Sequence, residues 1–229
     1  MQKHVNNDTY QEYLVQVIGY FIGDGSIETK GTPYISSKYK SLLTRYEKLI
    51  HLIYPDTITS IRIYHKRNSK WSPEYRLYLM KSFFLNEILK EAYILRIMDK
   101  LNVLTMDLIL YSSNDVKIGF LRGLFDAEGG LYWRQNHACE IKISTTLASL
   151  LSSIEVILNY FNIKHIVRTD KRRDKKHKSD VYYIRIFGDH AKDFIRVFKP
   201  YKLYLSEYIV KHVDSKYRKR LKGLLGQIE

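Results

Sequence analysis

The pattern of apolar positions in the first half of the chain predicts a regular alternation of helices and strands. Residues 41–54 place apolar side chains at helical spacing, whereas residues 26–37 lack that period and are expected to be extended. Apolar and polar residues then alternate in the runs 59–64 and 75–80, which predicts the two strands of a hairpin. A further helix is expected from Ser82 to about Met98. With the apolar helix that opens the chain, the first half has the order α-β-β-α-β-β-α.

The second half repeats this order. Strands are expected near residues 131–134, 140–144, 164–169 and 181–187, a helix at 147–160, and helical segments from Asp189 onward. We therefore expect an α+β fold made of two pseudo-symmetric repeats, residues 1–98 and 114–229. The connection, residues 99–113, is apolar rather than rich in Gly and Ser, so we expect it to pack down and hold the repeats rigidly.

A short motif ends the first helix of each half, at Val17–Gly25 and Leu121–Gly129. The two copies are separated by 104 residues, and each ends in an acidic residue followed by glycine. Within each copy, two small residues stand four apart, about one helical turn, so they share a helix face that lets two backbones approach closely. The two motif helices are therefore expected to pack on each other. Capping and stop residues stand at the ends of both helices: Asp8-Thr9 and Ser112-Ser113-Asn114 before them, Gly25 and Gly129 after them.

The motif acids, Asp24 and Glu128, are unusual at these positions. A carboxylate in the last turn of a helix faces the negative end of the helix dipole, and packing the helices would bring the two acids together. A cation is expected between them. A hard divalent ion, Mg²⁺ by preference with Mn²⁺ as a substitute, accepts carboxylate oxygens, keeps several waters and is commonly completed by substrate phosphate. Such an ion can activate water for attack on a phosphodiester.

The outward faces of the expected strands carry basic and aromatic side chains, and two basic hairpin tips occupy equivalent positions in the repeats. Antiparallel strands of this kind can read base edges in the major groove, and the tips suit phosphate contacts. The residues expected to contact DNA are Arg62, Tyr64, Lys66, Arg67, Lys70, Arg76, Tyr78, Arg134, Gln135, Lys142, Arg168, Lys171, Arg172, Arg173, Tyr183 and Arg185.

Composition narrows the class of protein. A net charge of +14 and a pI near 9.6 indicate an anionic partner, and 229 residues with 45% hydrophobic residues can bury a substantial core. The longest apolar segments, around 14–23 and 104–110, are too short to span a membrane. The single cysteine, Cys139, excludes an internal disulfide and a cysteine zinc cluster, and the eight histidines lack ligand spacing. An intracellular setting is expected, with no basic-hydrophobic leader at Met1.

The duplicated motif resembles that of the LAGLIDADG homing endonucleases, in the single-chain form that carries both copies. The first copy keeps Gly19, Asp24 and Gly25. The second keeps more of the pattern, with Glu128 in place of the acid: Leu121, Gly123, Leu124, Asp126, Ala127 and Gly129. The resemblance extends over nearly the whole chain, because each motif is followed by the same order of elements.

This resemblance implies a monomeric, site-specific endonuclease that binds a long asymmetric DNA duplex on a saddle of two antiparallel sheets and cleaves both strands across the minor groove. Asp24 and Glu128 would bind the metal with help from the carbonyls of Gly23 and Ala127. The family also places a basic residue near the scissile phosphates. That position falls on Lys38 in the first half and on Thr145-Thr146 in the second, where Lys142 is a substitute.

Other functions remain open on the same fold. A group I intron maturase would bind structured RNA and use the motifs for packing alone, and a DNA-binding regulator would have lost one or both acids. Retention of both acids favours the nuclease. A form embedded in an intein is disfavoured, because the sequence opens at Met1 without flanking splicing residues.

Overall fold

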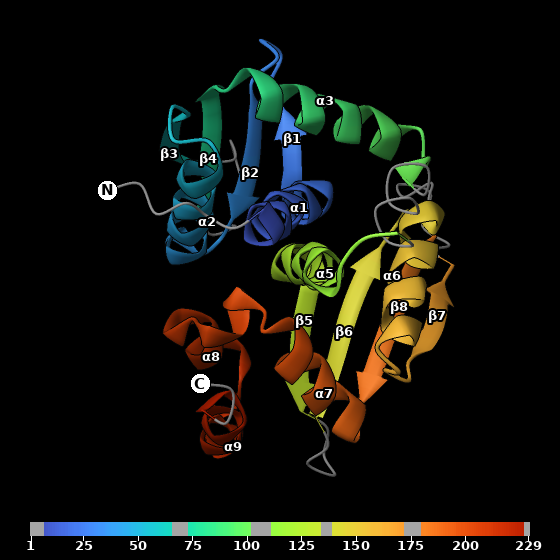
Figure 1. Cartoon of the computed structure of the whole chain (residues 1–229). Helices are drawn as coiled ribbons and strands as arrows, with labels where there is room; N and C mark the ends of the chain where they lie inside the picture. Colours follow the sequence, from blue (N-terminus) through green and yellow to red (C-terminus); the bar gives the residue numbers. More distant parts are fainter. Residues whose placement is uncertain (1–6, 66–72, 102–110, 134–138, 172–179, 227–229) are drawn as a thin grey trace.

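The structure, a computed structural model, describes residues 7–65, 73–101, 111–133, 139–171 and 180–226. The expected α-β-β-α-β-β-α order is confirmed in both repeats (Figure 1). The first repeat consists of α1 (Asn7–Asp24), β1 (Gly25–Ile27), β2 (Pro33–Ser37), α2 (Lys40–Ile53), β3 (Ile58–Tyr64), β4 (Glu74–Lys81) and α3 (Phe83–Ile97). The second consists of α5 (Asn114–Glu128), β5 (Gly129–Trp133), β6 (Cys139–Thr145), α6 (Ala148–Tyr160), β7 (Ile166–Asp170), β8 (Val181–Phe187) and α7 (Gly188–Phe198). A tail follows, with η1 (Tyr201–Tyr204), α8 (Ser206–His212) and α9 (Ser215–Gly226).

Each repeat contains one four-stranded antiparallel sheet, and the two sheets have the same strand order. The orders are β1-β2-β4-β3 and β5-β6-β8-β7. Helices cover one face of each sheet, where Ile35 and Leu77 of the first and Ile143 and Ile184 of the second are buried. The opposite faces carry the polar and aromatic residues of the same strands, as the alternation predicts.

One strand departs from the expected burial. The alternation of apolar and polar residues in 59–64 places Ile63 of β3 on the aliphatic face that the helices should cover, but the residue is 57% exposed. β3 is an edge strand that pairs only with β4, and the exposure of its last three residues shows that the helices do not cover this end.

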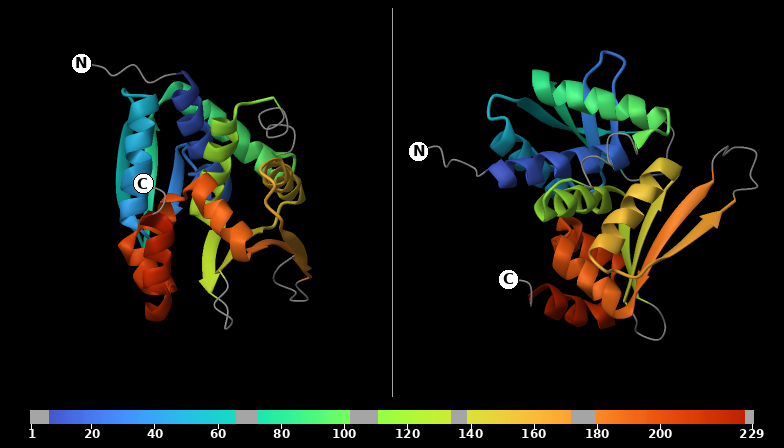
Figure 2. Two further views of the ribbon diagram at one scale, coloured as in Figure 1. Left: turned by 60° about the horizontal axis from the view of Figure 1, so that its bottom comes forward. Right: turned by 45° about the vertical axis from the view of Figure 1, so that its right-hand side comes forward.

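Helices α1 and α5 lie side by side at the centre of the molecule, with one sheet on either side of the pair (Figures 1 and 2). Both helices are enclosed, with Tyr20 and Phe21 of α1 and Leu121 and Phe125 of α5 fully buried. The motif helices therefore pack at the interface between the repeats, as expected. Among the described helices, none combines the length and the apolar character needed to cross a bilayer.

The ends of the motif helices agree with the sequence in part. Ser113 caps α5, because its side chain accepts a hydrogen bond from the backbone N–H of Val116. Gly129 does follow α5, but its φ of −83° and ψ of 160° are extended, so it is not a left-handed stop. Glycine is needed there for space: an added Cβ would lie 2.2 Å from the ring of Phe125.

The described ends of the connection between the repeats pack down only in part, since Tyr111 is 86% exposed. Leu101 is buried, and the carboxylate of Asp99 accepts hydrogen bonds from the backbone N–H groups of Ala148 and Ser149 at the start of α6. Asp99 therefore caps a helix of the second repeat. Residues 102–110 lie outside the described residues, and the limits of the repeats at 98 and 114 remain predictions.

Candidate active site

The contact between the motif helices depends on glycines that allow backbone to meet backbone. An ideal Cβ on Gly19 would lie 2.3 Å from the carbonyl oxygen of Phe120, and one on Gly123 would lie 2.0 Å from that of Gln16. These contacts are equivalent under the repeat, since Phe120 stands 104 residues after Gln16. At the C-terminal ends the contact continues between Gly23 and Ala127. The helix ends, and the acids that follow, are thereby brought together.

Asp24 and Glu128 lie at this meeting point, in partly buried surroundings. Burial raises the pKa of Asp24 to about 6, against the opposing charges of Lys202 and Arg96. The pKa of Glu128 is raised to about 7, first by burial and then by the negative charge of Asp24. The two carboxylates therefore repel each other, and a bound cation would stabilise them.

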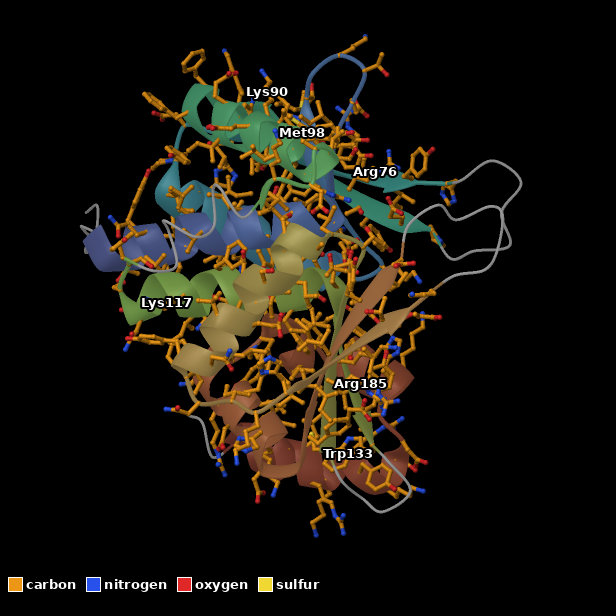
Figure 3. All side chains as sticks on the ribbon, turned by 90° about the vertical axis from the view of Figure 1, so that its right-hand side faces the viewer. Arg76, Lys90, Met98, Lys117, Trp133 and Arg185 are labelled. Carbon is orange, nitrogen blue, oxygen red and sulfur yellow. The ribbon has the colours of Figure 1, made fainter. Side chains whose placement is uncertain are left out.

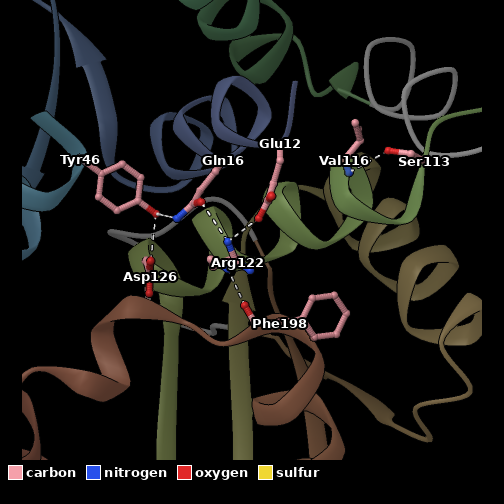
Figure 4. A network of polar contacts seen from close by, with 8 residues as sticks. All are labelled: Glu12, Gln16, Tyr46, Ser113, Val116, Arg122, Asp126 and Phe198. Atoms are coloured by element: carbon pink, nitrogen blue, oxygen red, sulfur yellow. Dashed lines mark hydrogen bonds and ion pairs between the residues drawn. The ribbon is translucent and has the colours of Figure 1, made fainter. Parts of the chain in front are cut away.

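Asp126, the other motif acid, has a different environment. It is fully buried, and it accepts hydrogen bonds from the hydroxyl of Tyr46 at 2.9 Å and the backbone N–H of Lys202 at 2.8 Å. Figure 4 shows that Tyr46 also contacts Gln16 of α1, which in turn contacts Arg122 of α5. Asp126 thus belongs to a polar network that ties the two repeats together.

Two cations of the protein, Lys202 and Arg96, meet the ends of the motif helices. Lys202 Nζ donates to the carbonyl oxygens of Ala127 at 3.1 Å and Gly129 at 2.9 Å, and Arg96 Nη1 donates to that of Gly25 at 2.8 Å. Gly25 and Gly129 are equivalent motif positions, so each repeat supplies one cation to its own motif. Positive charge here opposes the negative end of each helix dipole. Burial lowers the pKa of Lys202 against the charges of the surrounding acids, Asp24 first.

Hollows flank the acid pair on two sides. One, of about 340 Å³, is lined by Asp24 and Glu128 together with Lys38, Lys202 and His212. The other, of about 200 Å³, is lined by Glu128 and, from the other elements around it, Gly23, Arg96, Ser144, Thr145 and Thr146. Each hollow thus combines a motif acid, a cation and the end of β2 or β6.

The structure places the residues predicted for catalysis in two groups. Lys38 lines the larger hollow, and its charge lowers the pKa of Asp24. Lys142 does not line either of these hollows; it lies on the second sheet, with Nζ 3.8 Å from the centre of the Tyr183 ring. Lys142 thus contacts Tyr183 of β8 on the face of the second sheet, and the cation that lines the smaller hollow is Arg96 instead. The carbonyl of Ala127, expected to bind metal, accepts a hydrogen bond from Lys202.

The described strand residues predicted to contact DNA lie on the open faces of the two sheets, but Tyr78 is only 7% exposed there. Figure 3 shows Arg76 and Arg185 beside the strands of the two sheets. Lys117, in contrast, lies on helix α5, away from these strands. Lys171, the residue directly after β7, is exposed. The hairpin-tip residues fall outside the described residues: Lys66, Arg67, Lys70, Arg134, Gln135, Arg172 and Arg173.

Sequence reasoning missed Arg96, Lys202 and His212. Arg96 lies in α3, 72 residues after Asp24, whereas Lys202 lies in η1 of the tail, 74 residues after Glu128, so the repeat does not align the two cations in the sequence. His212 has no signal in the sequence either. Its Nε2 lies 2.6 Å from the hydroxyl of Tyr39, and it comes from the tail, for which the first repeat has no counterpart among the described elements.

The residues present fit a divalent ion that keeps part of its hydration shell. Within the described part of the chain, no three His, Cys, Asp or Glu side chains are grouped to hold a metal. Two carboxylates with raised pKa values beside an open hollow are too few for a closed metal site. They suit Mg²⁺, which commonly takes one or two carboxylates and fills its remaining positions with water and phosphate oxygens.

Two repeats joined through glycine-lined motif helices are the architecture that the resemblance to proteins with two LAGLIDADG motifs implied. The resemblance found in the sequence is thereby confirmed at the level of the fold. Residues 115–199 also match the family model of the LAGLIDADG-like domain.

Solved structures of similar fold include DNA-bound homing endonucleases. I-DmoI in complex with DNA and Mn has a TM-score of 0.52 and 16% identity, over 82% of this chain and 97% of that one. I-WcaI bound to its DNA recognition sequence has a TM-score of 0.57 and 15% identity, over 88% and 85%. The N-terminal LAGLIDADG domain of DUF199/WhiA has a TM-score of 0.55 and 15% identity, over 93% and 87%. At these identities the likeness concerns the fold.

One curated protein is also similar in sequence. It is the glutamine–fructose-6-phosphate aminotransferase (isomerizing) of Methanocaldococcus jannaschii, 26% identical over 163 residues. These residues are 71% of this chain, but the match spans only 14% of the aminotransferase. The likeness is therefore confined to a small part of that protein.

Proposed function

We propose that this protein is a site-specific, metal-dependent DNA endonuclease. The duplex would lie along the open faces of the two sheets, with each half of an asymmetric target on one repeat. The observation that carries the proposal is the meeting of Asp24 and Glu128 at the ends of two crossing helices, with a cation-bearing hollow on two sides. One hollow for each DNA strand is what cleavage of both strands requires.

Asp24 and Glu128 are the residues that would hold Mg²⁺. When bound, the ion would make water a stronger nucleophile and stabilise the leaving oxygen of the phosphodiester. The residues of the chain orient the reacting groups. Lys38 reaches the larger hollow, where it would bind a phosphate oxygen. Lys202 and Arg96 hold the main chain at the motif ends and offset the charge of the acids.

The two hollows differ in a way that bears on strand cleavage. Ser37 and Thr145 hold equivalent positions, because each side-chain oxygen accepts a hydrogen bond from the backbone N–H two residues later, at 3.1 Å in both cases. The next residue is Lys38 in the first repeat and Thr146 in the second. The larger hollow therefore has Lys38 in addition to Lys202, whereas Arg96 is the cation that lines the smaller one. We expect the DNA strand in the larger hollow to be cleaved faster.

Cleavage selection on a randomised duplex library with Mg²⁺ tests this function. The full chain is compared with Asp24→Asn and Glu128→Gln, which keep the shape of each side chain and remove its charge. We expect each variant to bind the selected duplex but to cleave it about 10² to 10⁴ times more slowly, as loss of several kcal/mol of transition-state stabilisation implies.

Three results would contradict the proposal. Cleavage by both variants at the wild-type rate would show that the two acids take no part in the reaction. Tight, sequence-specific binding without cleavage by the wild type would make the protein a DNA-binding module. Binding of a structured intron RNA, with no duplex selected, would favour the maturase function.

A further inference from the structure

On the open face of each sheet, one arginine is held by a glutamate. Arg76 Nε donates to Glu74 at 3.1 Å, and Arg185 Nε donates to Glu140 at 2.5 Å. The side chain of Glu140 is only 6% exposed although it lies on the open face. A buried carboxylate that pairs with one arginine fixes the direction of that guanidinium.

Aromatic rings restrict the same two guanidinium groups. The Cζ atom of Arg76 lies 3.5 Å from the centre of the Tyr64 ring, and that of Arg185 lies 5.2 Å from the centre of the Phe187 ring. The glutamates contact Nε, so these ion pairs do not use the two Nη groups. A guanidinium held in this way is preorganised for a bidentate contact with the O6 and N7 atoms of guanine in the major groove.

The two arginines do not occupy equivalent positions. The ends of β2 and β6 match at Ser37 and Thr145, so Ser36 is equivalent to Ser144. Ser36 pairs with Arg76 on β4, but Ser144 pairs with Tyr183 on β8. Arg185 therefore lies two residues from the position that corresponds to Arg76.

The direction of this shift follows from the strand pairing. Arg185 pairs with Lys142, three residues before the end of β6, whereas Arg76 pairs with Ser36, one residue before the end of β2. These strand ends line the hollows beside the acids. Arg185 is thus further from the acid pair, by two residues or about 7 Å of strand. Base pairs are about 3.4 Å apart along the duplex, so the shift corresponds to about two base pairs.

We propose that Arg76 and Arg185 each read one guanine, in opposite halves of the DNA target. The guanine read by Arg185 lies about two base pairs further from the centre of cleavage than the guanine read by Arg76. This inference rests on the proposed function, and it identifies part of the target sequence.

The base preferences of the selected duplexes provide the test. The wild-type preference profile should contain one strongly preferred guanine in each half, at distances from the centre that differ by about two base pairs. Arg185→Gln should lower affinity for the wild-type target about 10- to 100-fold and shift the preference at its own position from guanine towards adenine. Arg76→Gln should do the same in the other half. Arg196→Gln is the matched control, because Arg196 is also paired with an acid but lies on α7, behind the second sheet.

A positioning role for Glu140 is tested separately from folding. Glu140→Gln should reduce discrimination at the guanine of Arg185 only, and it should have no further effect on that discrimination in the Arg185→Gln background. A merely structural role would weaken binding to all bases in both backgrounds. Thermal unfolding of each variant shows whether it is folded, and the spacing of the wild-type guanines tests the inference without any substitution.

The outcomes separate this inference from the function on which it rests. Failure of the wild type to select any duplex would overturn both. A selected target without these guanines, or with guanines at equal distances from the centre, would overturn the inference alone. So would Arg→Gln variants that lose affinity equally for all four bases.

Discussion

Gly123→Ala tests the close contact of the motif helices on which the candidate site depends. The new Cβ would lie 2.0 Å from the carbonyl oxygen of Gln16 and 2.9 Å from the backbone nitrogen of Tyr20. Ordinary contact begins at 3.4 Å, so the first distance is short by about 1.4 Å. Both neighbours are backbone atoms of α1, so no side chain can rotate to relieve the clash and the two helices must separate.

The expected cost follows from two opposing effects. Overpacking of a close-packed interface costs about 1–3 kcal/mol, and a clash with backbone should lie near the upper limit. Replacing glycine by alanine inside a helix returns about 1 kcal/mol. We therefore expect Gly123→Ala to lower the free energy of unfolding by about 2 kcal/mol. Cleavage should fall as well, because separating the helices moves Glu128 away from Asp24.

Gly223→Ala is the matched control. Gly223 lies inside α9, where an added Cβ would meet no atom within 4 Å. This variant should be more stable than the wild type by about 0.5–1 kcal/mol and should cleave normally. Urea unfolding followed by circular dichroism measures both variants. If Gly123→Ala proves as stable as Gly223→Ala, the helices are not held at backbone contact and the account of the site is wrong.

Three further predictions concern the charges of the site. Burial and Asp24 raise the pKa of Glu128 from 4.5 to about 7, so the folded state holds more protons than the unfolded state between these values and stability falls as pH rises through them. Without metal, Glu128→Gln should therefore be more stable than the wild type at pH 8 but not at pH 4, as measured by thermal unfolding at both pH values. An equal change of melting temperature at both pH values would contradict the raised pKa of Glu128 as the cause. At Mg²⁺ concentrations too low to saturate the site, wild-type cleavage should rise with pH up to about 7, because Glu128 must lose its proton before it can hold the ion. Lys202→Met should move this rise to higher pH, because Lys202 lowers the pKa of both acids; an unchanged midpoint in a pH–rate profile would exclude that role. Lys38→Ala should slow the nicking of one strand more than the other, and Thr146→Lys should bring the two rates closer, as measured on end-labelled duplex; equal slowing of both strands by Lys38→Ala would show that the hollows are not strand-specific.

Much of the fold could be predicted from the sequence because both repeats obey local rules. The helical spacing in α2, the alternation in β4 and β8, and the small residues of the motifs each reflect contacts within one element or between equivalent elements. The exposure of Ile63 could not be foreseen, since alternation shows which residues share a face but not how far the helices cover it. The extended conformation of Gly129 could not be predicted for a similar reason. A glycine can be needed because a neighbouring side chain, here the ring of Phe125, leaves no room for a Cβ atom, and not only because the backbone has a positive φ angle.

Only part of the candidate site could be predicted from the sequence. Asp24 and Glu128 stand in a duplicated motif, and duplication is what distinguished them from ordinary turn residues. Arg96 and Lys202 act from elements that follow the sheets, more than 70 residues after the acids they face, and no local pattern marks them. Electrostatics predicts a cation between the acids, and a bound metal remains a prediction. The charges of Lys202 and Arg96 lower the pKa values of both acids, so part of the opposing charge comes from the chain itself.

The tail makes the site depend on the correct docking of both repeats. Tyr201 of η1 lies under Arg45 of the first repeat, with the guanidinium carbon 3.6 Å from the ring centre. The hydroxyl of Tyr208 in α8 accepts a hydrogen bond from the backbone N–H of Leu131, in the sheet of the second repeat. Lys202 lies between Tyr201 and Tyr208 in the sequence. A lysine that is buried beside three acids can be held there only if both repeats are in place, because otherwise its charge would be hydrated elsewhere at lower cost. Complete assembly of the acid pair and its cation should therefore coincide with docking of the tail on both repeats.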